Sequence, residues 1–508
     1  MPLRQKPGTP SLLRELNDRA ALELLLAEGP LTRAQLSERT GVSKVTVSQM
    51  LARLEERALV MIAGEQAGGR GPNAALYSVI PSSAYVAGLY VDFDLVSVAV
   101  ADVAGNQVAE VSMDPHGADD PVGLVREAIG QACANAGISS ETLSSVVIGS
   151  PGVLDPRTGA PRLAVNLPTW QEGVLDGLRE VLHTPVLIEN DVNLAAMAER
   201  AGGAAAGLDD FAFVWLGTGL GLASVIGGKV RRGVGGAAGE IGWMPVHGAP
   251  LPVGNEHPGK AGLQALAGGL AVQALAAQHG FSGASPADAV AAATADAASG
   301  VQGSAGAAFL DDLAQRVSIG VAAICVVLDP GLVVLGGPVG KAGGSELATR
   351  VAAEVARICL AHPAVEPTTA ADEPVLRGAL QTALAQARAG LLGSLGSPSE
   401  IPALESAEDQ LDGSVDFTGL RCVQAAREVS EAGGVDGSHL VDQHEGADAV
   451  HLDLGAEDRG LCAGGRRGDD EGGEQDRVAL DGDCVPRAAL LVAGRVLGRA
   501  QPVQITTH

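Results

Sequence analysis

The feature that most constrains the fold is a long central segment, about residues 84 to 392, in which short Val- and Ile-rich runs alternate with helical stretches. The runs are bounded by Gly, Pro or Asp, and they include "YVAGLYVDF", "SVAVADV", "SSVVIGSPG", "PVLIEN", "FAFVWLGTG" and "GLVVLGG". Helical stretches such as "NLAAMAERAGGAAAG" and "DLAQRVSIGVAAICVVL" follow several of them. This alternation is typical of an α/β domain. Strand-rich openings near Val86 and Phe211, each followed by a glycine-marked turn, predict two similar lobes.

Residues 11 to 80 form a separate unit with a helical pattern. Apolar side chains recur there at helical spacing, at Leu13, Leu16, Ala20, Leu24 and Ala27. A second short helix is expected in "TRAQLSERT", and Ser43 caps a third one whose inner face carries Val47, Leu51 and Leu54. Two strand candidates, "LVMIA" and "ALYSV", flank the loop "GEQAGGRGPN". The pattern predicts a winged helix-turn-helix.

The third helix and the loop carry the side chains that a DNA reader needs. Hydroxyl groups near the helix start can contact phosphates, a Lys and a Gln can reach base edges, and a Val can touch a thymine methyl group. The residues we expect at DNA are Ser43, Lys44, Val45, Thr46, Ser48, Gln49, Arg53 on the backbone and Arg70 in a minor groove. The alternative interpretation is a three-helix module that binds another protein.

Charge restricts how such a chain could reach DNA. The 508 residues carry a formal charge of −26, and an acidic surface repels phosphates, so any DNA binding must come from a local patch. The unit 11–80 is about charge-balanced, which favours it as that patch. We find neither a signal peptide at the start nor an apolar run of about 18 residues, so we expect a cytoplasmic protein away from membranes. The six cysteines form no CxxC pair.

After about residue 396 the sequence becomes Gly-, Asp- and Glu-rich, and it has no clear period. A segment of that composition cannot bury enough apolar surface to fold, so we expect an acidic, mostly disordered tail over 396–508.

Three motifs point to a family. The stretches "IENDVNLAAMAER", "WLGTGLGLASVIGGKVRRGVGGAAGEIG" and "LDPGLVVLGGPV" resemble the ROK family of repressors and sugar kinases, and the resemblance covers about residues 11 to 392. It implies a winged helix over 11–80 and, over 84–395, a two-lobed actin-like, ribonuclease-H-like sugar-kinase fold. Members of the family sense sugars or phosphorylate hexoses with ATP.

The resemblance also implies a sugar site. Its residues would be Asn166, Asn190, Asp191, Glu240 and Gln264, with Asp191 in the place of a kinase's general base. The alternative for Asn190 and Asp191 is that they only cap the helix that follows. The turn "LGTGLG" would approach a nucleotide phosphate in a kinase.

The chain departs from the family at two places. Where kinases of the family carry two glycines after Asp92, this chain has Asp94 and Leu95, and a carboxylate with side chains there opposes phosphate binding. Trp243 replaces a zinc-binding His, and the loop directly after it, up to about residue 269, has no cysteine, so we expect no metal and no cofactor. His247 and His257 are interpreted as ordinary loop residues. Trp243 either stacks on a sugar or fills the space of the zinc.

These features together predict a transcriptional regulator, most simply a repressor. It would bind operator DNA as a homodimer or homotetramer and take a sugar or sugar derivative as effector, without catalysis. The first alternative is an ATP-dependent sugar kinase with an attached DNA-binding head. The second is a protein that binds DNA constitutively and uses its cleft only as a dimerisation scaffold.

Overall fold

The computed structural model describes residues 10–67, 73–92, 95–116, 118, 120–154, 161–163, 177–178, 182, 184–253, 259–299, 301 and 303–395, and two short strands beyond them. The chain divides into two units, Met1–Ile401 and Pro402–His508. In the second unit the described residues are the antiparallel strands β16 (Val450–His451) and β17 (Ala479–Leu480). The expected disorder of residues 396–508 otherwise lies outside the described residues.

The N-terminal part of the first unit is a winged helix. Its elements are α1 (Pro10–Glu28), β1 (Leu31–Thr32), α2 (Arg33–Thr40), α3 (Lys44–Glu56), β2 (Val60–Gln66) and β3 (Ala74–Val79). Thr32 caps α2 in a capping box with Gln35, and Gly41 ends that helix with a left-handed φ of 69°. The three strands pair in the order β1-β3-β2. This arrangement confirms the predicted helix-turn-helix and wing strands.

The inner face of α1 differs from the apolar spacing seen in the sequence. Leu13 and Leu16 are 58% and 43% exposed, whereas Ala21, Leu22 and Leu25 are buried. The buried face thus differs from the one expected, and it includes Asp18, which pairs with Arg53 of α3. Helical periodicity alone does not distinguish an apolar stripe from its neighbour when the helix is rich in Leu and Ala.

Two five-stranded sheets of matching topology follow. The first has the order β10-β7-β4-β5-β6 and the second β13-β12-β11-β14-β15; in each, three antiparallel strands are extended by two parallel ones. The first contains β4 (Tyr85–Val91), β5 (Val96–Asp102), β6 (Gln107–Met113), β7 (Leu143–Ser150) and β10 (Val186–Asn190). The second contains β11 (Phe211–Leu216), β12 (Leu220–Ile226), β13 (Lys229–Val230), β14 (Leu332–Gly336) and β15 (Ala364–Pro367). The predicted two similar lobes are confirmed.

Helices cover both sheets. The outer face of the first sheet packs on α4 (Pro121–Asn135). The outer face of the second packs on α7 (Gln264–Ala267), α8 (Gly269–Gln278), α9 (Pro286–Ala297), α10 (Ala305–Leu328) and α11 (Gly337–Ile358). Short elements complete this part: η1 (Pro81–Ser83), η2 (Ser140–Thr142), β8 (Val153–Leu154), β9 (Pro161–Leu163) and η4 (Ile241–Trp243). No helix of the described part of the chain is long and apolar enough to cross a membrane.

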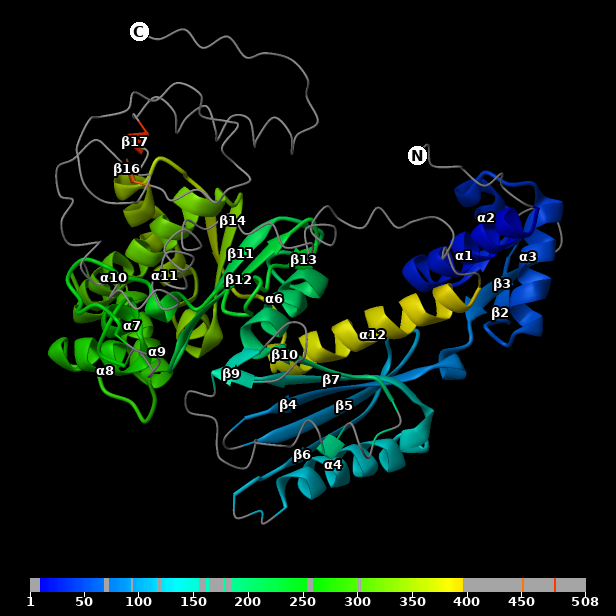
Figure 1. Ribbon diagram of the computed structural model, residues 1–508, viewed down its shortest axis with the longest axis horizontal. Coiled ribbons are helices and arrows are strands. Elements are labelled where there is room, and N and C mark those ends of the chain that lie inside the picture. The colour runs from blue at the N-terminus through cyan, green and yellow to red at the C-terminus, as the bar shows by residue number, and fades with distance from the viewer. Residues whose placement is uncertain are drawn as a thin grey trace, which may run out of the picture. The chain divides into compact units, whose positions relative to one another are not determined.

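Two further helices lie between the sheets. One apolar cluster combines residues of both sheets with α6 (Asp191–Gly202) and α12 (Pro374–Ser394). The far end of α12 reaches the winged helix, where Leu392 and Leu395 belong to the same buried cluster as Leu22, Leu51 and Tyr77 (Figure 1). Helix α12 therefore joins the two-sheet region to the winged helix through a shared core.

Candidate functional site

The start of α3 presents the side chains expected at DNA. Lys44, Val45 and Gln49 are exposed, and Val45 is 69% exposed although it is apolar. Ser43 is the N-cap, and its Oγ accepts a hydrogen bond from the Thr46 backbone N–H at 3.2 Å. The Ser48 hydroxyl donates to the Lys44 carbonyl at 3.0 Å. An exposed Val beside polar groups at the start of this helix suits a groove lined by base edges.

Arg53 has an intramolecular partner that sequence reasoning missed. Its Nε donates to the Asp18 carboxylate at 2.7 Å, and hydrogen bonding to that carboxylate raises the pKa of the guanidinium. The pair ties α3 to α1. The structure thus gives Arg53 a role inside the head, and its expected contact with the DNA backbone stays a prediction. Arg70 lies outside the described residues.

Asn190 and Asp191 lie where β10 ends and α6 begins. Asn190 caps the helix, since its Oδ1 accepts from the Asn193 N–H at 3.2 Å, and its Nδ2 donates to the Gly152 carbonyl at 3.2 Å. Asn190 therefore caps α6, and its expected contact with a sugar stays a prediction. Asp191 is the first residue of α6 and accepts from the Val192 N–H at 2.8 Å. Asn166 lies outside the described residues.

Three carboxyl groups and a phenol gather around the start of α6. Burial, followed by the negative charge of Asp92, raises the pKa of Asp191 to about 6. Burial and then Asp191 raise the pKa of Glu240. The Tyr90 hydroxyl donates to Asp92 at 2.9 Å, and burial, Asp191 and Asp92 together raise the pKa of Tyr90. Tyr90 was missed because it reads as an ordinary strand residue. Such a set of acceptors and one donor suits the hydroxyl groups of a polar ligand.

Glu240 comes to this place from the second sheet. It precedes the short helix η4, and the Trp243 N–H donates to its carbonyl at 3.1 Å. Trp243 is half-buried. Glu240 and Asp191 thus come from two different sheets and lie close enough for the charge of Asp191 to act on Glu240, and their contact with a sugar stays a prediction.

Gln264 is buried and bound to main-chain groups. Its Oε1 accepts from the Leu220 N–H at 3.2 Å, and its Nε2 donates to the Thr218 carbonyl at 2.9 Å. These bonds fix the turn between β11 and β12. A direct contact between Gln264 and a sugar hydroxyl stays a prediction.

The loop after Glu240 does not offer the donors of a zinc site. Its described residues contain no thiol and a single imidazole, the exposed His247, while His257 lies outside the described residues. Among the residues that the structure describes, no group of three or more His, Cys, Asp or Glu side chains could hold a metal ion.

An indole lies against the glycine turn that would approach a phosphate in a kinase. A Cβ built on Gly217 would lie 2.9 Å from Nε1 of Trp215 and 3.4 Å from Cδ of Pro338. Trp215 also packs on Phe213, with ring centroids 6.4 Å apart. At the other expected phosphate position, the Asp92 N–H donates to the Leu95 carbonyl at 2.9 Å, and Asp94 lies outside the described residues.

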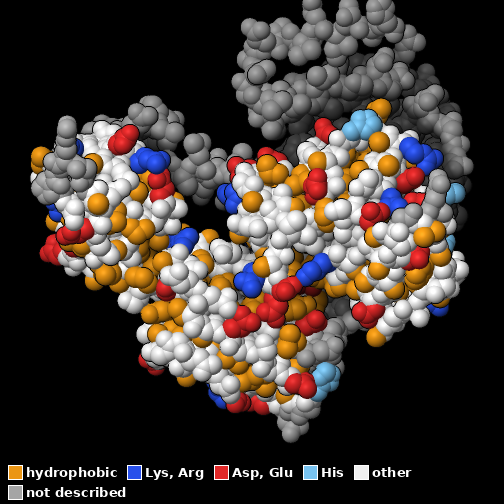
Figure 2. All heavy atoms as spheres, turned by 180° about the vertical axis from the view of Figure 1, so that it is seen from behind, with side chains coloured by type: hydrophobic (Ala, Val, Ile, Leu, Met, Phe, Trp, Pro, Cys, Tyr) orange, Lys and Arg blue, Asp and Glu red, His pale blue; other side chains and the backbone are white. Residues whose placement is uncertain are grey.

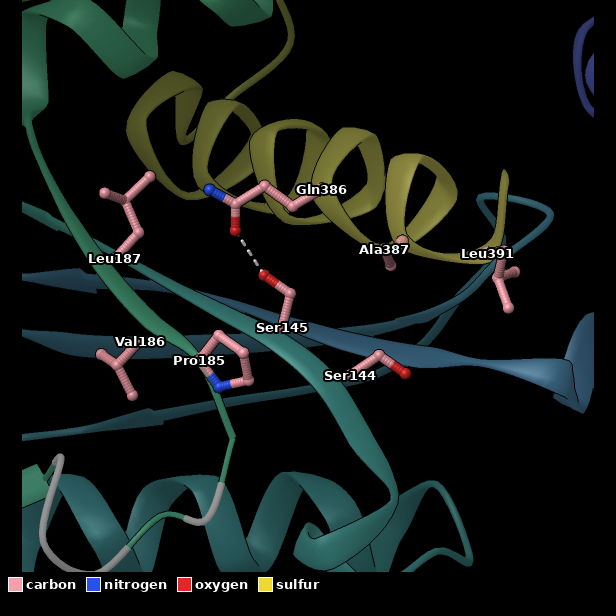
Figure 3. Close-up of a pocket in the computed structure, with 9 residues that line it drawn as sticks. Ser144, Ser145, Pro185, Val186, Leu187, Gln386, Ala387 and Leu391 are labelled. Carbon is pink, nitrogen blue, oxygen red and sulfur yellow. Dashed lines mark hydrogen bonds between the residues drawn. The ribbon is translucent and has the colours of Figure 1, made fainter. Parts of the chain in front are cut away.

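A cavity of about 490 Å³ lies at the opposite end of β10 from Asp191. Its walls are β7, the start of β10 and α12, and within it the Ser145 hydroxyl donates to Gln386 Oε1 at 2.7 Å (Figure 3). The remaining lining residues are mostly apolar, and none is charged. The cavity is thus separate from the cluster of carboxyl groups.

Comparison with family models assigns both parts. A model described as the ROK family matches residues 88–388, and one described as the MarR family matches residues 16–71.

Curated relatives include regulators. The chain is 27% identical over 243 residues to the xylose repressor of Bacillus subtilis (strain 168), which is 46% of this chain and 62% of the repressor. It is 23% identical over 270 residues to the DNA-binding transcriptional dual regulator NagC of Escherichia coli (strain K12), which is 52% of this chain and 66% of NagC. The match thus spans less than two thirds of the repressor's own length.

A solved structure supports the fold over both parts. The crystal structure of a ROK family transcriptional regulator, a homologue of the E. coli MLC protein, superposes with a TM-score of 0.60 at 18% identity, covering 75% of this chain and 98% of that one. The ROK hexokinase of Thermus thermophilus superposes with a TM-score of 0.50 at 27% identity, and the match covers 60% of this chain and 100% of the hexokinase.

Proposed function

We propose that this chain, which belongs to the ROK family, is a transcriptional regulator whose two-sheet domain binds a sugar or sugar derivative and whose winged helix binds operator DNA. The observation that carries the proposal is α12. One half of this helix packs against α6, which begins at Asp191, and its last turn is part of the winged-helix core. A protein that only phosphorylated sugars would not need a shared core between these parts.

Backbone contacts connect the proposed sugar site, at the start of α6, with the winged helix. Asp191 begins α6, and Leu194 lies one turn later. A Cβ built on Gly378 of α12 would lie 1.8 Å from the Leu194 carbonyl oxygen, so the two helices touch main chain to main chain. At the other end, Arg57 of the head donates to the Ser394 carbonyl at 2.7 Å. A ligand that shifts α6 therefore shifts a helix anchored in the head.

We propose that phosphoryl transfer is absent. The Trp215 indole on the Gly217 turn and the side chains of Asp94 and Leu95 oppose the close approach of a nucleotide phosphate. A coupled assay of ATP consumption with D-xylose, D-glucose and amino sugars tests this. Sustained turnover with any of them would reverse the assignment in favour of the kinase alternative.

The proposed regulator acts as a dimer or a pair of dimers on symmetric operators, and it acts in the cytoplasm. The chain carries a formal charge of −26, and in Figure 2 the winged helix, at the left, shows side chains of both signs, as does the rest of that face. DNA binding is therefore expected to be local to the head and to weaken steeply with salt.

A gel-shift experiment tests the whole proposal. Duplex DNA from upstream of the protein's own gene is titrated at low salt, alone and with a panel that starts with D-xylose, because a relative is a xylose repressor. Binding that one sugar changes supports the regulator. Binding that no sugar changes, together with a melting temperature that no sugar shifts, favours the constitutive DNA-binding alternative.

A further inference from the structure

Glu189 is a buried carboxylate immediately before Asn190 and Asp191. Its side chain is 6% exposed. One oxygen accepts hydrogen bonds from the Asn193 Nδ2 at 2.8 Å and from the Asn190 N–H at 2.9 Å. The other accepts from the Arg232 Nε at 2.6 Å. A carboxylate removed from water in this way needs such donors, because an unpaired buried charge is costly.

Arg232 reaches Glu189 from the other sheet. It follows β13, at the beginning of the loop that ends at Glu240. Its own carbonyl accepts from the Ala238 N–H at 3.3 Å, which closes the loop on itself. The loop is attached to its own sheet at Gly239, whose carbonyl accepts from the Leu222 N–H at 2.8 Å. The Arg232 side chain attaches the same loop to the end of β10.

The Arg232–Glu189 contact opposes the repulsion between carboxyl groups of the two sheets. Asp191 and Glu240 approach one another from different sheets, and the charge of Asp191 contributes to raising the pKa of Glu240. Two like charges would push the Glu240 loop away from β10. The guanidinium of Arg232 opposes this movement and neutralises Glu189 at the same time.

We infer that Glu189 and Arg232 are positioning residues, which hold the Glu240 loop against Asn190 and Asp191 so that the ligand-facing groups of the two sheets stay together. Neither side chain needs to touch the ligand. The consequence for sugar binding rests on the proposed function, whereas the attachment of the loop does not.

Hydrogen exchange of the full chain tests the attachment without any ligand. In Arg232→Met and Glu189→Gln, amides of residues 232–244 should exchange at least about tenfold faster than in the wild type, and peptides from α10 and the winged helix should be unchanged. Arg232→Lys, which keeps the charge, should restore part of the protection. Lys229→Met is the matched control, since it removes a positive charge from the same hairpin, and it should change nothing.

The double variant shows whether Glu189 and Arg232 act through their contact with one another or whether each substitution destabilises the domain separately. If the two side chains act only through one another, Glu189→Gln with Arg232→Met should exchange no faster than the worse single variant. Unchanged exchange in both single variants, or an equal rise across the whole domain, overturns the inference. If Arg232→Met does not fold, Arg232→Lys and Glu189→Gln decide in the same way.

A melting experiment with D-xylose and D-glucose keeps the two claims apart. For a sugar that raises the melting temperature of the wild type, Arg232→Met should weaken the affinity at least about fivefold, and Lys229→Met should not. If neither sugar stabilises the wild type, the proposed function loses support, and the exchange result still decides whether the pair holds the loop.

Discussion

Gly378 of α12 lies directly against the carbonyl of Leu194 in α6, so close that a methyl group on Gly378 would lie 1.8 Å from that oxygen. Leu194 is one turn from Asp191, and α12 continues into the core of the winged helix. The close approach of two backbones, which only glycine permits here, links the carboxyl cluster to the DNA-binding head.

Replacing Gly378 by Ala should force α6 and α12 apart, because backbone atoms cannot yield as a flexible side chain can. We expect a loss of about 1–3 kcal/mol in the free energy of unfolding, measured by urea titration. The effect of a bound sugar on DNA affinity should also shrink. Gly390→Ala in the same helix meets nothing within 4 Å and should be neutral or stabilising by about 0.5–1 kcal/mol. If Gly378→Ala and Gly390→Ala have the same free energy of unfolding, the close contact between Gly378 and Leu194 does not contribute to stability.

The end of α12 should be part of the head in energetic terms as well. Leu395 is 4% exposed in the winged-helix core, so Leu395→Ala should destabilise the head by about 2–5 kcal/mol and weaken DNA binding. The measurement is the melting of the head, followed by hydrogen exchange of α3, together with a gel-shift. Gly393→Ala is the control, since a Cβ there enters open space. If the α3 amides of Leu395→Ala stay as protected from hydrogen exchange as in the wild type, the end of α12 does not stabilise the winged helix.

Asp191 should make stability depend on pH. Its pKa of about 6 lies above the value of about 3.9 in an unfolded chain, so the native state binds this proton more tightly. Its contribution to stability is full below about pH 4 and is lost as the pH rises through about 6. Between pH 4 and pH 7 the free energy of unfolding of the wild type should therefore fall by on the order of 1–2 kcal/mol relative to that of Asp191→Asn.

Urea unfolding at several pH values, followed by tryptophan fluorescence, measures this difference. Glu141→Gln, at an exposed position of η2, should run parallel to the wild type over the same range. If the free energies of unfolding of wild type and Asp191→Asn differ by the same amount at every pH, burial does not raise the pKa of Asp191.

Lys44 and Gln49 are exposed at the start of α3, and we predict that they read bases. Lys44→Ala and Gln49→Ala should each cost about 1–3 kcal/mol of binding to the best operator and should relax sequence choice. Selection from a random duplex library, followed by fluorescence anisotropy on the selected and scrambled sites, measures both effects. Gln131→Ala, an exposed change on α4, should leave both unchanged. Operator affinity that survives both α3 variants would exclude this helix as the reader.

Much of the fold could be predicted because its signals are local. The apolar run before Asn190 predicts β10, and Ser43 predicts the start of α3. Other elements could not. Helix α11 begins at Gly337 within "LGGPVG", which has the composition of a turn, and Pro338 lies in its first turn, where the missing N–H costs nothing.

The candidate site was predictable only where one motif carries it. Asn190 and Asp191 are neighbours in one motif, and Glu240 follows a glycine-rich turn, so the resemblance places all three. Glu189 and Arg232 are 43 positions apart, and nothing local in either stretch reveals the pair. The same holds for Arg53 and Asp18, 35 positions apart, because a partner that arrives through the fold leaves no pattern in the sequence.

The affinity of the full chain for its selected operator, measured by fluorescence anisotropy as a function of sugar concentration, decides whether sugar binding and DNA binding are coupled. We predict that one sugar changes the operator Kd by about 5–150-fold, and that operator DNA changes the affinity for that sugar by the same factor. The assignment as a regulator is contradicted if the protein binds no duplex at low salt. It is equally contradicted if a sugar binds tightly and leaves the operator Kd unchanged.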